Sequence, residues 1–409
     1  MYQSISACRI CGNRNLIVVL QLGEQALTGV FPKRKDDPIT KGPLTLVKCC
    51  GDGVCGLLQL AHSYSLSEMY GENYGYRSGL NPSMVAHLKS KVARIKSFDL
   101  IQSNDIIVDI GSNDATTLKL YDRPDCQLVG IDPTGAKFRG YYTSNVRLIP
   151  DFFSSTNFHA AFPGRKARVV TSFSMFYDLE DPIEFMRQVA QIMEDDGIWV
   201  FEQSYMPSML KTNSYDTVCH EHLEYYALAQ IMWMAEKVGL KIVDVEINDV
   251  NGGSFSVVAQ KTTGTLRPTS AVGSLLEEER RSGLDDLATY LAFGQRVEES
   301  RIGLLAFLRR AKSEGRRVVA LGASTKGNVL LQYCGVDSSL IDAVGEINPD
   351  KFGSYTPGTL INIVDETTLL ASKPDYVLVL PWHFRSFFQS QVRYKELHLV
   401  YPLPELSIG

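Results

Sequence analysis

The sequence predicts an α/β protein in which a small cysteine-rich N-terminal domain precedes two Rossmann-like domains, each an open parallel sheet covered by helices. Residues 104–121 read as a buried strand, a glycine turn and a helix, and residues 316–333 repeat that order. Five of the eight cysteines fall within the first 55 residues. Because 409 residues are too many for one core, we expect domains at 1–75, 76–265 and 266–409. Amphipathic helices should lead into the last of them.

The composition is that of an ordinary globular protein, with 44% hydrophobic and 21% charged residues. No apolar run is long enough to span a bilayer and the N-terminus does not read as a signal peptide, so we expect a cytoplasmic protein without membrane partners. The net charge of -5 argues against a broad nucleic-acid-binding surface. An anionic ligand should therefore be held by local groups, in a chain that we expect to be a monomer or a weak oligomer.

The N-terminal cysteines are spaced as ligands of a structural metal. Cys8 and Cys11 form a C-x-x-C turn, and Cys55 supplies a second pair with either Cys49 or Cys50. Four thiolates close a tetrahedral Zn²⁺ site, which adds folding energy to a small domain. We favour Cys49 as the third ligand, since the GDG insert then forms the knuckle loop. The alternative is a set of free buried thiols; a nucleic-acid-binding zinc ribbon is disfavoured because basic residues do not cluster around the knuckles.

The first glycine turn favours an adenosine ligand that carries positive charge. The turn after the predicted strand contains Asp109, Gly111 and Asn113. A second strand ends at Asp132, an acid placed to accept hydrogen bonds from both ribose hydroxyls. A dinucleotide site would need G-x-G-x-x-G to seat a pyrophosphate, whereas this turn has one glycine and has carboxylates where phosphates would sit. Negative charge suits a sulfonium, so S-adenosylmethionine is favoured over NAD.

Later strand ends point to the same crevice. Asp151 and Phe152 follow a third strand, where they could bond and stack an adenine, and Glu202 ends a further strand. Ligands of open α/β sheets bind beyond the carboxyl ends of the strands, so these side chains should converge with Asp132.

Several segments form a specific combination over nearly the whole chain. They are the cysteine clip followed by GLLQLAHSY, then YGENYGYRSG, DIGSND, the Glu221–His222 pair, NGGSFSVVAQK, and GASTKGNVLL with PGT. With them the chain resembles the S-adenosylmethionine-dependent C-methyltransferases that act on nucleotide-linked 4-keto-6-deoxyhexoses, usually at C-3. The resemblance implies a zinc domain, a cofactor-binding core and a C-terminal α/β domain, with the sugar nucleotide between the flanking domains. The sequence departs from the family at Ala115, where many members have glycine, at GASTKG in place of GAAAKG, and at Cys219, where some have tyrosine.

Methylation of carbon requires a carbanion equivalent, which a neighbouring ketone makes accessible as an enolate. The protein must then supply a base near C-3, donors at the developing oxyanion and an aligned methyl sulfonium. The segment YDTVCHEHLEYYAL has two histidines, but they are two residues apart and not four as in a zinc protease helix. The segment therefore favours proton transfer over metal binding.

The resemblance assigns roles within these segments. It implies that His222 is the base and that Glu221 orients it or holds a sugar hydroxyl. His220 is left in a supporting or purely structural place. In YGENYGYRSG, Tyr76 is expected to donate to the enolate oxygen and Tyr74 to contact the sugar; packing is the alternative for both phenols.

The second glycine turn favours phosphate. Ser324 and Lys326 begin a helix with no carboxylate nearby, Asn328 follows on that helix, and Glu346 ends the next strand. We expect these four residues to hold the nucleotide diphosphate of the substrate, whose base could be that of dTDP, GDP, CDP or UDP. A second NAD site is the rival interpretation, although a third glycine is missing. The rival functions are a sugar O-methyltransferase and a non-enzymatic zinc protein that binds S-adenosylmethionine or a nucleotide.

Overall fold

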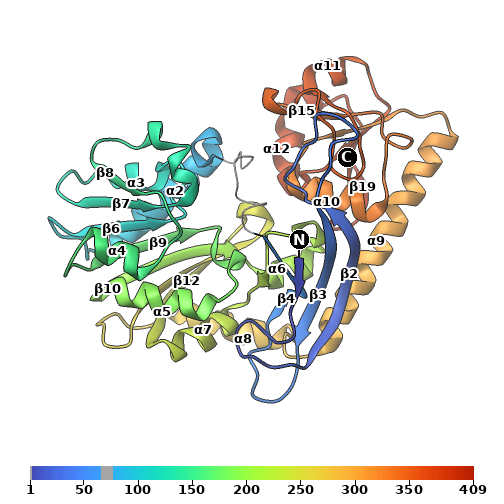
Figure 1. Ribbon diagram of the computed structural model, residues 1–409. Helices are drawn as coiled ribbons and strands as arrows, with labels where there is room; N and C mark the ends of the chain where they lie inside the picture. The colour runs from blue at the N-terminus through green and yellow to red at the C-terminus, as the bar shows by residue number, and fades with distance from the viewer. Residues whose placement is uncertain (1, 66–76) are drawn as a thin grey trace.

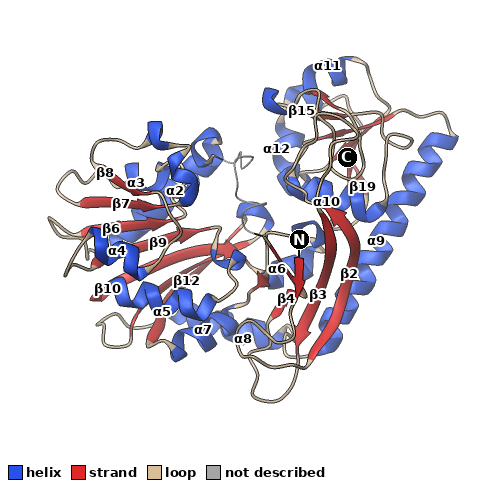
Figure 2. Cartoon of the chain, viewed as in Figure 1, coloured by secondary structure: helices blue, strands red, loops and turns tan. Residues whose placement is uncertain are grey.

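The computed structural model describes residues 2–65 and 77–409. Figure 1 shows two lobes: the central sheet lies in one, and the C-terminal domain lies in the other, next to the long N-terminal strands. Figure 2 shows that helices pack against the faces of the sheets. Within residues 2–65 and 77–409, no helix combines the length and the apolar character needed to span a membrane.

The N-terminal domain is an antiparallel sheet that the central part of the chain completes. Its strands, in spatial order, are β11 (Glu224–Tyr225), β4 (Leu58–Leu60), β3 (Lys41–Cys49) and β2 (Leu16–Ala26). A separate ribbon pairs β1 (Tyr2–Ser4) with β5 (His62–Tyr64). Because β11 follows directly on the Glu221–His222 pair, the register of Glu224 opposite Gln59 fixes that segment against the N-terminal domain.

The central domain is a seven-stranded sheet in which six strands run in the same direction and β13 (Ser254–Lys261) runs antiparallel to them. In spatial order it consists of β12 (Leu240–Asn248), β13, β10 (Met193–Ser204), β9 (Ala167–Phe173), β6 (Ile106–Ile110), β7 (Gln127–Ile131) and β8 (Val146–Ile149). The first strand in sequence, β6, lies between β7 and β9, so the winding direction reverses beside it. In such sheets the crevice beyond the carboxyl ends at the reversal is where ligands bind.

Helices connect and cover these strands. They are α2 (Pro82–Ser97), α3 (Thr116–Lys119), α4 (Ser155–Ala161), α5 (Pro182–Ile192), α6 (Met206–Thr212) and α7 (Leu228–Lys237). Local sequence sets their first turns: Asn81 and Ser154 cap α2 and α4 by accepting backbone N–H groups, and Pro82 begins α2. The central domain therefore has the predicted Rossmann-like architecture.

The C-terminal domain repeats the open α/β plan. Its sheet has the order β16 (Ile363–Asp365), β15 (Val344–Glu346), β14 (Val318–Leu321), β17 (Tyr376–Val379), β18 (Leu399–Tyr401) and β19 (Ser407–Ile408). All of these strands are parallel except β19. The helices are α8 (Ser270–Arg281), α9 (Leu287–Ser313), α10 (Thr325–Cys334), α11 (Glu366–Ala371) and α12 (Arg385–Ser390). The second predicted Rossmann-like sheet is thus present, with its own crevice beside β14.

The helix α9 ties the C-terminal domain to the N-terminal sheet. In Figure 1 it runs along β2 for much of the length of that strand. Gly294 makes the close approach possible, since a Cβ atom at that position would overlap the carbonyl oxygen of Val19. The expected amphipathic helices therefore serve packing between domains.

Candidate functional site

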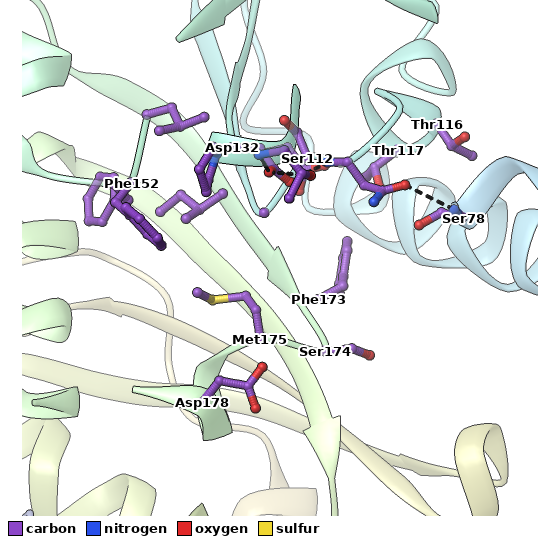
Figure 3. A pocket seen from close by; sticks show the side chains of 18 of the residues that line it. Ser78, Ser112, Thr116, Thr117, Asp132, Phe152, Phe173, Ser174, Met175 and Asp178 are labelled. Carbon is purple, nitrogen blue, oxygen red and sulfur yellow. Dashed lines mark hydrogen bonds between the residues drawn. The ribbon is translucent and has the colours of Figure 1, made fainter. Parts of the chain in front are cut away.

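A cavity of about 290 Å³ opens beyond the carboxyl ends of β6, β7 and β9. Its walls include Gly111 of the first glycine turn, Asp132 after β7, Phe152, and Met175 and Asp178 after β9. Figure 3 shows Asp132 and Met175 on facing sides of this space. The volume is close to the lower end of the range of small-molecule sites, about 300–1,000 Å³. Asp109, Asn113 and Phe152 of the predicted cofactor residues also line the cavity, whereas Asp151 lies next to it.

The glycine turn is held in a sharp left-handed path. Gly111, Asn113 and Ala115 have φ values of 73°, 48° and 59°. A left-handed φ is free of strain only for glycine, and asparagine tolerates it better than most residues. Ala115 is fully buried and precedes α3. The departure from glycine that the sequence shows at this position is therefore a substitution into a backbone conformation that glycine prefers.

Two carboxylates shape the turn. Asp132 accepts hydrogen bonds from the backbone N–H of Asn113 at 2.7 Å and of Thr134 at 2.6 Å, which draws the loops after β6 and β7 together. Asp109 accepts from the Thr171 hydroxyl at 2.6 Å, and burial raises the pKa of Asp109 to about 7. Asp132 therefore fixes the geometry of the turn. Asp109 joins β6 to β9 at the floor of the cavity through its hydrogen bond with Thr171.

The rim of the cavity carries an exposed aromatic ring. Phe152 lines the cavity and is 52% exposed, which is unusual for a phenylalanine. Asp151 beside it accepts from the Asn157 side chain at 3.1 Å. An exposed ring next to a carboxylate suits a flat, hydrogen-bonding ligand such as an adenine.

The Glu221–His222 segment lies directly behind one wall of the cavity. The single turn η4 (Phe176–Asp178) separates the two: Asp178 lines the cavity, while the Tyr177 ring meets the His222 ring edge-on at a centroid distance of 4.4 Å. The backbone N–H of Leu223 donates to the Tyr177 carbonyl, which fixes this arrangement. The predicted base and the predicted cofactor cavity are thus neighbours through one turn of chain.

The tautomer of His222 follows from its surroundings. Its Nδ1 donates to the carbonyl oxygen of Thr217 over 2.9 Å. A carbonyl only accepts, so in the neutral ring the hydrogen is on Nδ1 and the lone pair is on Nε2. Burial lowers the pKa of His222 to about 4, and the charge of Lys326 acts in the same direction. The ring is therefore neutral near pH 7 and offers Nε2 as a proton acceptor.

Glu221 and His220 occupy different surroundings. Burial raises the pKa of Glu221, and its Oε2 has no hydrogen-bond partner within the described chain. Its Oε1 lies 3.5 Å from the position of a Cβ on Gly29, so the N-terminal domain closes over it. His220 is fully buried, bonds the Gly42 carbonyl and packs edge-on against Tyr64. These contacts support a structural place for His220.

A polar cluster from the C-terminal domain adjoins His222. Lys326 donates from Nζ to the carbonyl oxygen of Asn251 at 2.6 Å, and Trp382 donates from Nε1 to the buried carboxylate of Asp216 at 2.8 Å. His383 lies against Gly252, and burial lowers the pKa of His383 to about 3, with the charge of Lys326 acting in the same direction. Asp216, Trp382 and His383 were not among the residues predicted from the sequence. The PWHF segment follows the end of β17, and a position beyond a parallel strand is the one sequence signal that indicates a site for Trp382 and His383.

The other residues predicted for the C-terminal site lie at the start of α10 and the end of β15. Ser324 caps α10 by accepting from the N–H of Gly327. Glu346 accepts from the N–H groups of Ile347 and Asn348. Asn328 is fully buried and donates to the Thr28 carbonyl at 2.7 Å, so it joins the C-terminal and N-terminal domains.

The two predicted tyrosines of YGENYGYRSG are outside this description. Tyr74 and Tyr76 both belong to residues 66–76, which lie between the described parts of the chain. Their predicted roles, contact with the sugar and donation to the enolate, stay predictions.

The N-terminal cysteines form a site with the geometry of a zinc centre. The Sγ atoms of Cys8, Cys11, Cys49 and Cys55 all lie within 4.8 Å of one another. The Cys8–Cys55 pair is 3.4 Å apart and the Cys11–Cys49 pair 3.5 Å. A tetrahedral centre with Zn–S bonds of about 2.3 Å requires sulfurs about 3.8 Å apart, so the four thiols fit Zn²⁺. Cys50 is not part of this cluster, in agreement with the choice of Cys49.

The electrostatics of the cluster also favour a cation. The pKa of Cys8 is lowered to about 5, chiefly by the Cys55 thiol, whereas burial raises the pKa of Cys49 to about 12. Once one of these crowded thiols has ionised, the others resist ionisation. A bound divalent cation would remove this resistance by stabilising several thiolates together. Asn13 donates to the Cys49 sulfur at 3.3 Å and supports it from outside the cluster.

Comparisons with known proteins agree with this three-part organisation. Family models match residues 8–70 as "Putative zinc binding domain", residues 84–245 as "Methyltransferase domain" and residues 249–404 as "C-methyltransferase C-terminal domain". A relative, the "C-methyltransferase NovU" of Streptomyces niveus, is 29% identical over 383 residues, which are 93% of this chain and 90% of the relative. The predictions of a methyltransferase with S-adenosylmethionine and zinc as cofactors are confirmed.

Solved structures are similar to less than half of the chain. An S-adenosylmethionine-dependent methyltransferase from Clostridium acetobutylicum is 12% identical, with a TM-score of 0.34, over 44% of this chain and 92% of the other. The plantazolicin methyltransferase BpumL in complex with SAH is 10% identical, with a TM-score of 0.34, over 43% of this chain and 83% of the other.

Proposed function

Because this chain belongs to the S-adenosylmethionine-dependent C-methyltransferases that carry a zinc-binding domain, we propose that it methylates C-3 of a nucleotide-linked 4-keto-6-deoxyhexose. One observation carries the proposal of a base: the hydrogen bond from His222 Nδ1 to the Thr217 carbonyl leaves Nε2 as the acceptor. The ring lies one turn of chain from the cavity beyond β6. A proton acceptor next to a methyl-donor cavity is what methylation of an acidic carbon requires.

The proposed reaction begins at the C-3 hydrogen. His222 Nε2 takes this proton, and the electrons of the C–H bond form the enolate with the 4-keto oxygen. S-adenosylmethionine supplies an electrophilic methyl group on a sulfonium. The C-3 carbon forms the new bond to that methyl group as the bond to sulfur breaks, the ketone is restored, and the proton on His222 leaves to solvent. Glu221 is placed to orient a sugar hydroxyl beside the base.

The proposed cofactor contacts divide between two ends of the cavity. Asp132 holds the ribose while Gly111 allows close approach of the backbone, and Asp109 and Asn113 shape the turn beneath. At the rim, Phe152 stacks on the adenine and Asp151 accepts from its amino group. The exposed face of Phe152 and its place on the cavity wall support this assignment.

The proposed nucleotide end of the substrate lies in the crevice of the C-terminal sheet. Ser324 at the start of α10 favours a phosphate because a helix N-terminus carries partial positive charge. Glu346 at the end of β15 is placed to bond the ribose or the base, and Asn328 supports the helix from within the interface with the N-terminal domain. The relative NovU is a C-methyltransferase, which supports carbon as the acceptor atom.

The experiment uses 4-keto-6-deoxyhexoses labelled with deuterium at C-3 and linked to dTDP, GDP, CDP or UDP. Mass spectrometry of the product distinguishes the hypotheses: C-methylation at C-3 loses the deuterium, whereas O-methylation retains it. A product that keeps the label supports the sugar O-methyltransferase, and no methylated product from any donor-acceptor pair supports the non-enzymatic alternative.

A matched pair of variants tests the base. His222→Asn should retain S-adenosylmethionine binding but lose turnover by roughly a hundredfold or more. His220→Asn removes a buried histidine two residues away that bonds Gly42, so we expect lower stability with turnover per folded molecule nearly unchanged. Equal turnover in His222→Asn and the wild type would exclude His222 as the base.

A further inference from the structure

Lys326 is a partly buried cation that no ion pair balances within the described chain. Its Nζ donates to the Asn251 carbonyl at 2.6 Å, and it forms no ion pair with any carboxylate in residues 2–65 and 77–409. Asp216 favours its charged form electrostatically, but the hydrogen bond of that carboxylate is to Trp382 and not to Nζ. An ammonium has three donors, so two N–H groups and the charge itself are available to a ligand.

The place of Lys326 in α10 increases its attraction for an anion. The residue lies in the first turn of this ten-residue helix, where the helix dipole adds partial positive charge. Burying a charge is costly unless an opposite charge or strong acceptors compensate it. The structure therefore calls for negative charge next to Nζ during binding or catalysis.

The surroundings of Nζ identify which end of the substrate brings that charge. Asn251 and Gly252 line a small cavity together with His222, and Nζ lies 3.9 Å from the position of a Cβ on Gly252. Lys326 thus lies beside the cavity of the base. Glu346 and Ser324, the residues suited to the ribose and a phosphate, bond locally within their own loops.

We propose that Lys326 is a further catalytic residue, whose ammonium donates a hydrogen bond to the C-4 oxygen as the enolate forms. The inference rests on the proposed function. His222 Nε2 takes the C-3 proton, the C–H electrons form the C-3=C-4 bond, and the carbonyl π electrons move to the oxygen that Lys326 faces. No proton passes from Lys326, and the ketone re-forms when the carbon is methylated. A fixed charge at this oxygen stabilises the enolate more than the ketone.

The same charge acts on the base. Lys326 lowers the pKa of His222, in addition to the larger effect of burial, and so keeps the free enzyme's imidazole neutral. The carboxylate of Asp216 acts on Lys326 in the opposite direction to burial and favours its charged form. Once the enolate exists, its negative charge lies between the ammonium and the imidazolium, which compensates both.

The test is hydrogen exchange at C-3 in D₂O with S-adenosylhomocysteine bound, because exchange reports enolate formation without methyl transfer. At saturating 4-keto sugar nucleotide, Lys326→Met should exchange roughly a hundredfold or more slowly than the wild type, and Lys326→Arg should retain more of the rate. The affinity of Lys326→Met for the nucleoside diphosphate alone should stay within about threefold of the wild type, since the lysine is assigned to the ketone end. A lost contact to the diphosphate worth about 1.4 kcal/mol would instead lower that affinity tenfold.

Lys351→Met is the contrasting variant. Lys351 bonds the Ala323 carbonyl at 2.7 Å and lies 3.6 Å from Glu346, at the proposed nucleotide end. Lys351→Met should weaken nucleoside diphosphate binding, which Lys326→Met should not. Thermal unfolding of each variant separates loss of exchange from loss of fold.

Two outcomes overturn the inference in distinguishable ways. If Lys326→Met exchanges at the wild-type rate at saturation, the lysine does not stabilise the enolate; a tenfold or larger loss of nucleoside diphosphate affinity in that variant would assign it to the diphosphate instead. If the wild type itself shows no exchange at C-3, the proposed function fails and this inference fails with it.

Discussion

The ionisation of His222 leads to a quantitative prediction about pH. The perturbation is a decrease from pH 7.5 to 5.5 during measurement of kcat/KM. The pKa of His222 is lowered to about 4: burial is the largest cause, the hydrogen bond to the Thr217 carbonyl acts against it, and the positive charge of Lys326 adds to the lowering. Because the charged imidazolium is disfavoured in the native protein, the acid limb of activity should move to lower pH.

The magnitude follows from the two pKa values. A base with the ordinary pKa of about 6.5 would be about 90% neutral at pH 7.5 and about 10% neutral at pH 5.5, so kcat/KM would fall roughly tenfold. With a pKa of about 4 the imidazole stays more than about 95% neutral at both pH values. We therefore expect the ionisation of His222 to change kcat/KM by less than about 10% over this range, although Asp109 in the cavity wall, with a pKa of about 7, also titrates there.

The assay is the initial rate of methyl transfer at low substrate concentration, because kcat/KM reports ionisation of the free enzyme. Activity must recover on return to pH 7.5, which controls for acid unfolding: buried neutral His220 and His222 contribute stability that falls as pH decreases from about 6.5 towards 4. Lys326→Met should raise the pKa of His222 and move the limb upward. A limb between pH 6 and 7 that persists in Asp109→Asn would refute the reasoning about burial of His222.

Three further predictions use matched pairs. Cys49→Ser should lose zinc by elemental analysis and lower the melting temperature, whereas Cys50→Ser, outside the four-sulfur cluster, should retain one zinc per chain; equal zinc contents would contradict the assignment. In α9, Gly294→Ala should destabilise the protein by about 1–3 kcal/mol in denaturant unfolding because its Cβ meets Val19, and Gly303→Ala, where nothing lies within 4 Å, should stabilise it by about 0.5–1 kcal/mol. Calorimetry should show that Asp132→Asn weakens S-adenosylmethionine binding about tenfold or more, while Glu346→Gln weakens only nucleoside diphosphate binding. The reverse pattern would mean that the ligands assigned to the two sites are interchanged.

The strand and helix order of both Rossmann-like sheets could be predicted because it is encoded locally. Largely apolar runs at 106–110 and 318–321, each followed by a glycine turn, indicate buried parallel strands without any knowledge of partners. The same holds for Cys8 and Cys11, whose spacing alone indicates a metal turn. What the patterns could not show is that β11 completes the N-terminal sheet, since a two-residue strand has no periodicity to detect.

The His222 cluster shows the limit most clearly. Asp216 and Lys326 are more than a hundred residues apart in the sequence, and Lys326 and His383 are tens of residues apart. Nothing in the local sequence of these residues indicates that they meet. The charge of Lys326 suggested phosphate when considered with its helix alone; only the contact with Asn251 places it beside the base.

The sequence by itself therefore determined the elements, the cysteine segments of the metal site and the chemical types available for methyl transfer, because propensity, periodicity and ligand spacing act over short stretches of chain. The choice between Cys49 and Cys50 needed the tertiary structure. The tertiary structure alone decided which of those groups share a site, which tautomer His222 adopts and how far burial moves its pKa. Those properties depend on desolvation and on the charge of Lys326 in the C-terminal domain, and they arise only when the domains pack together.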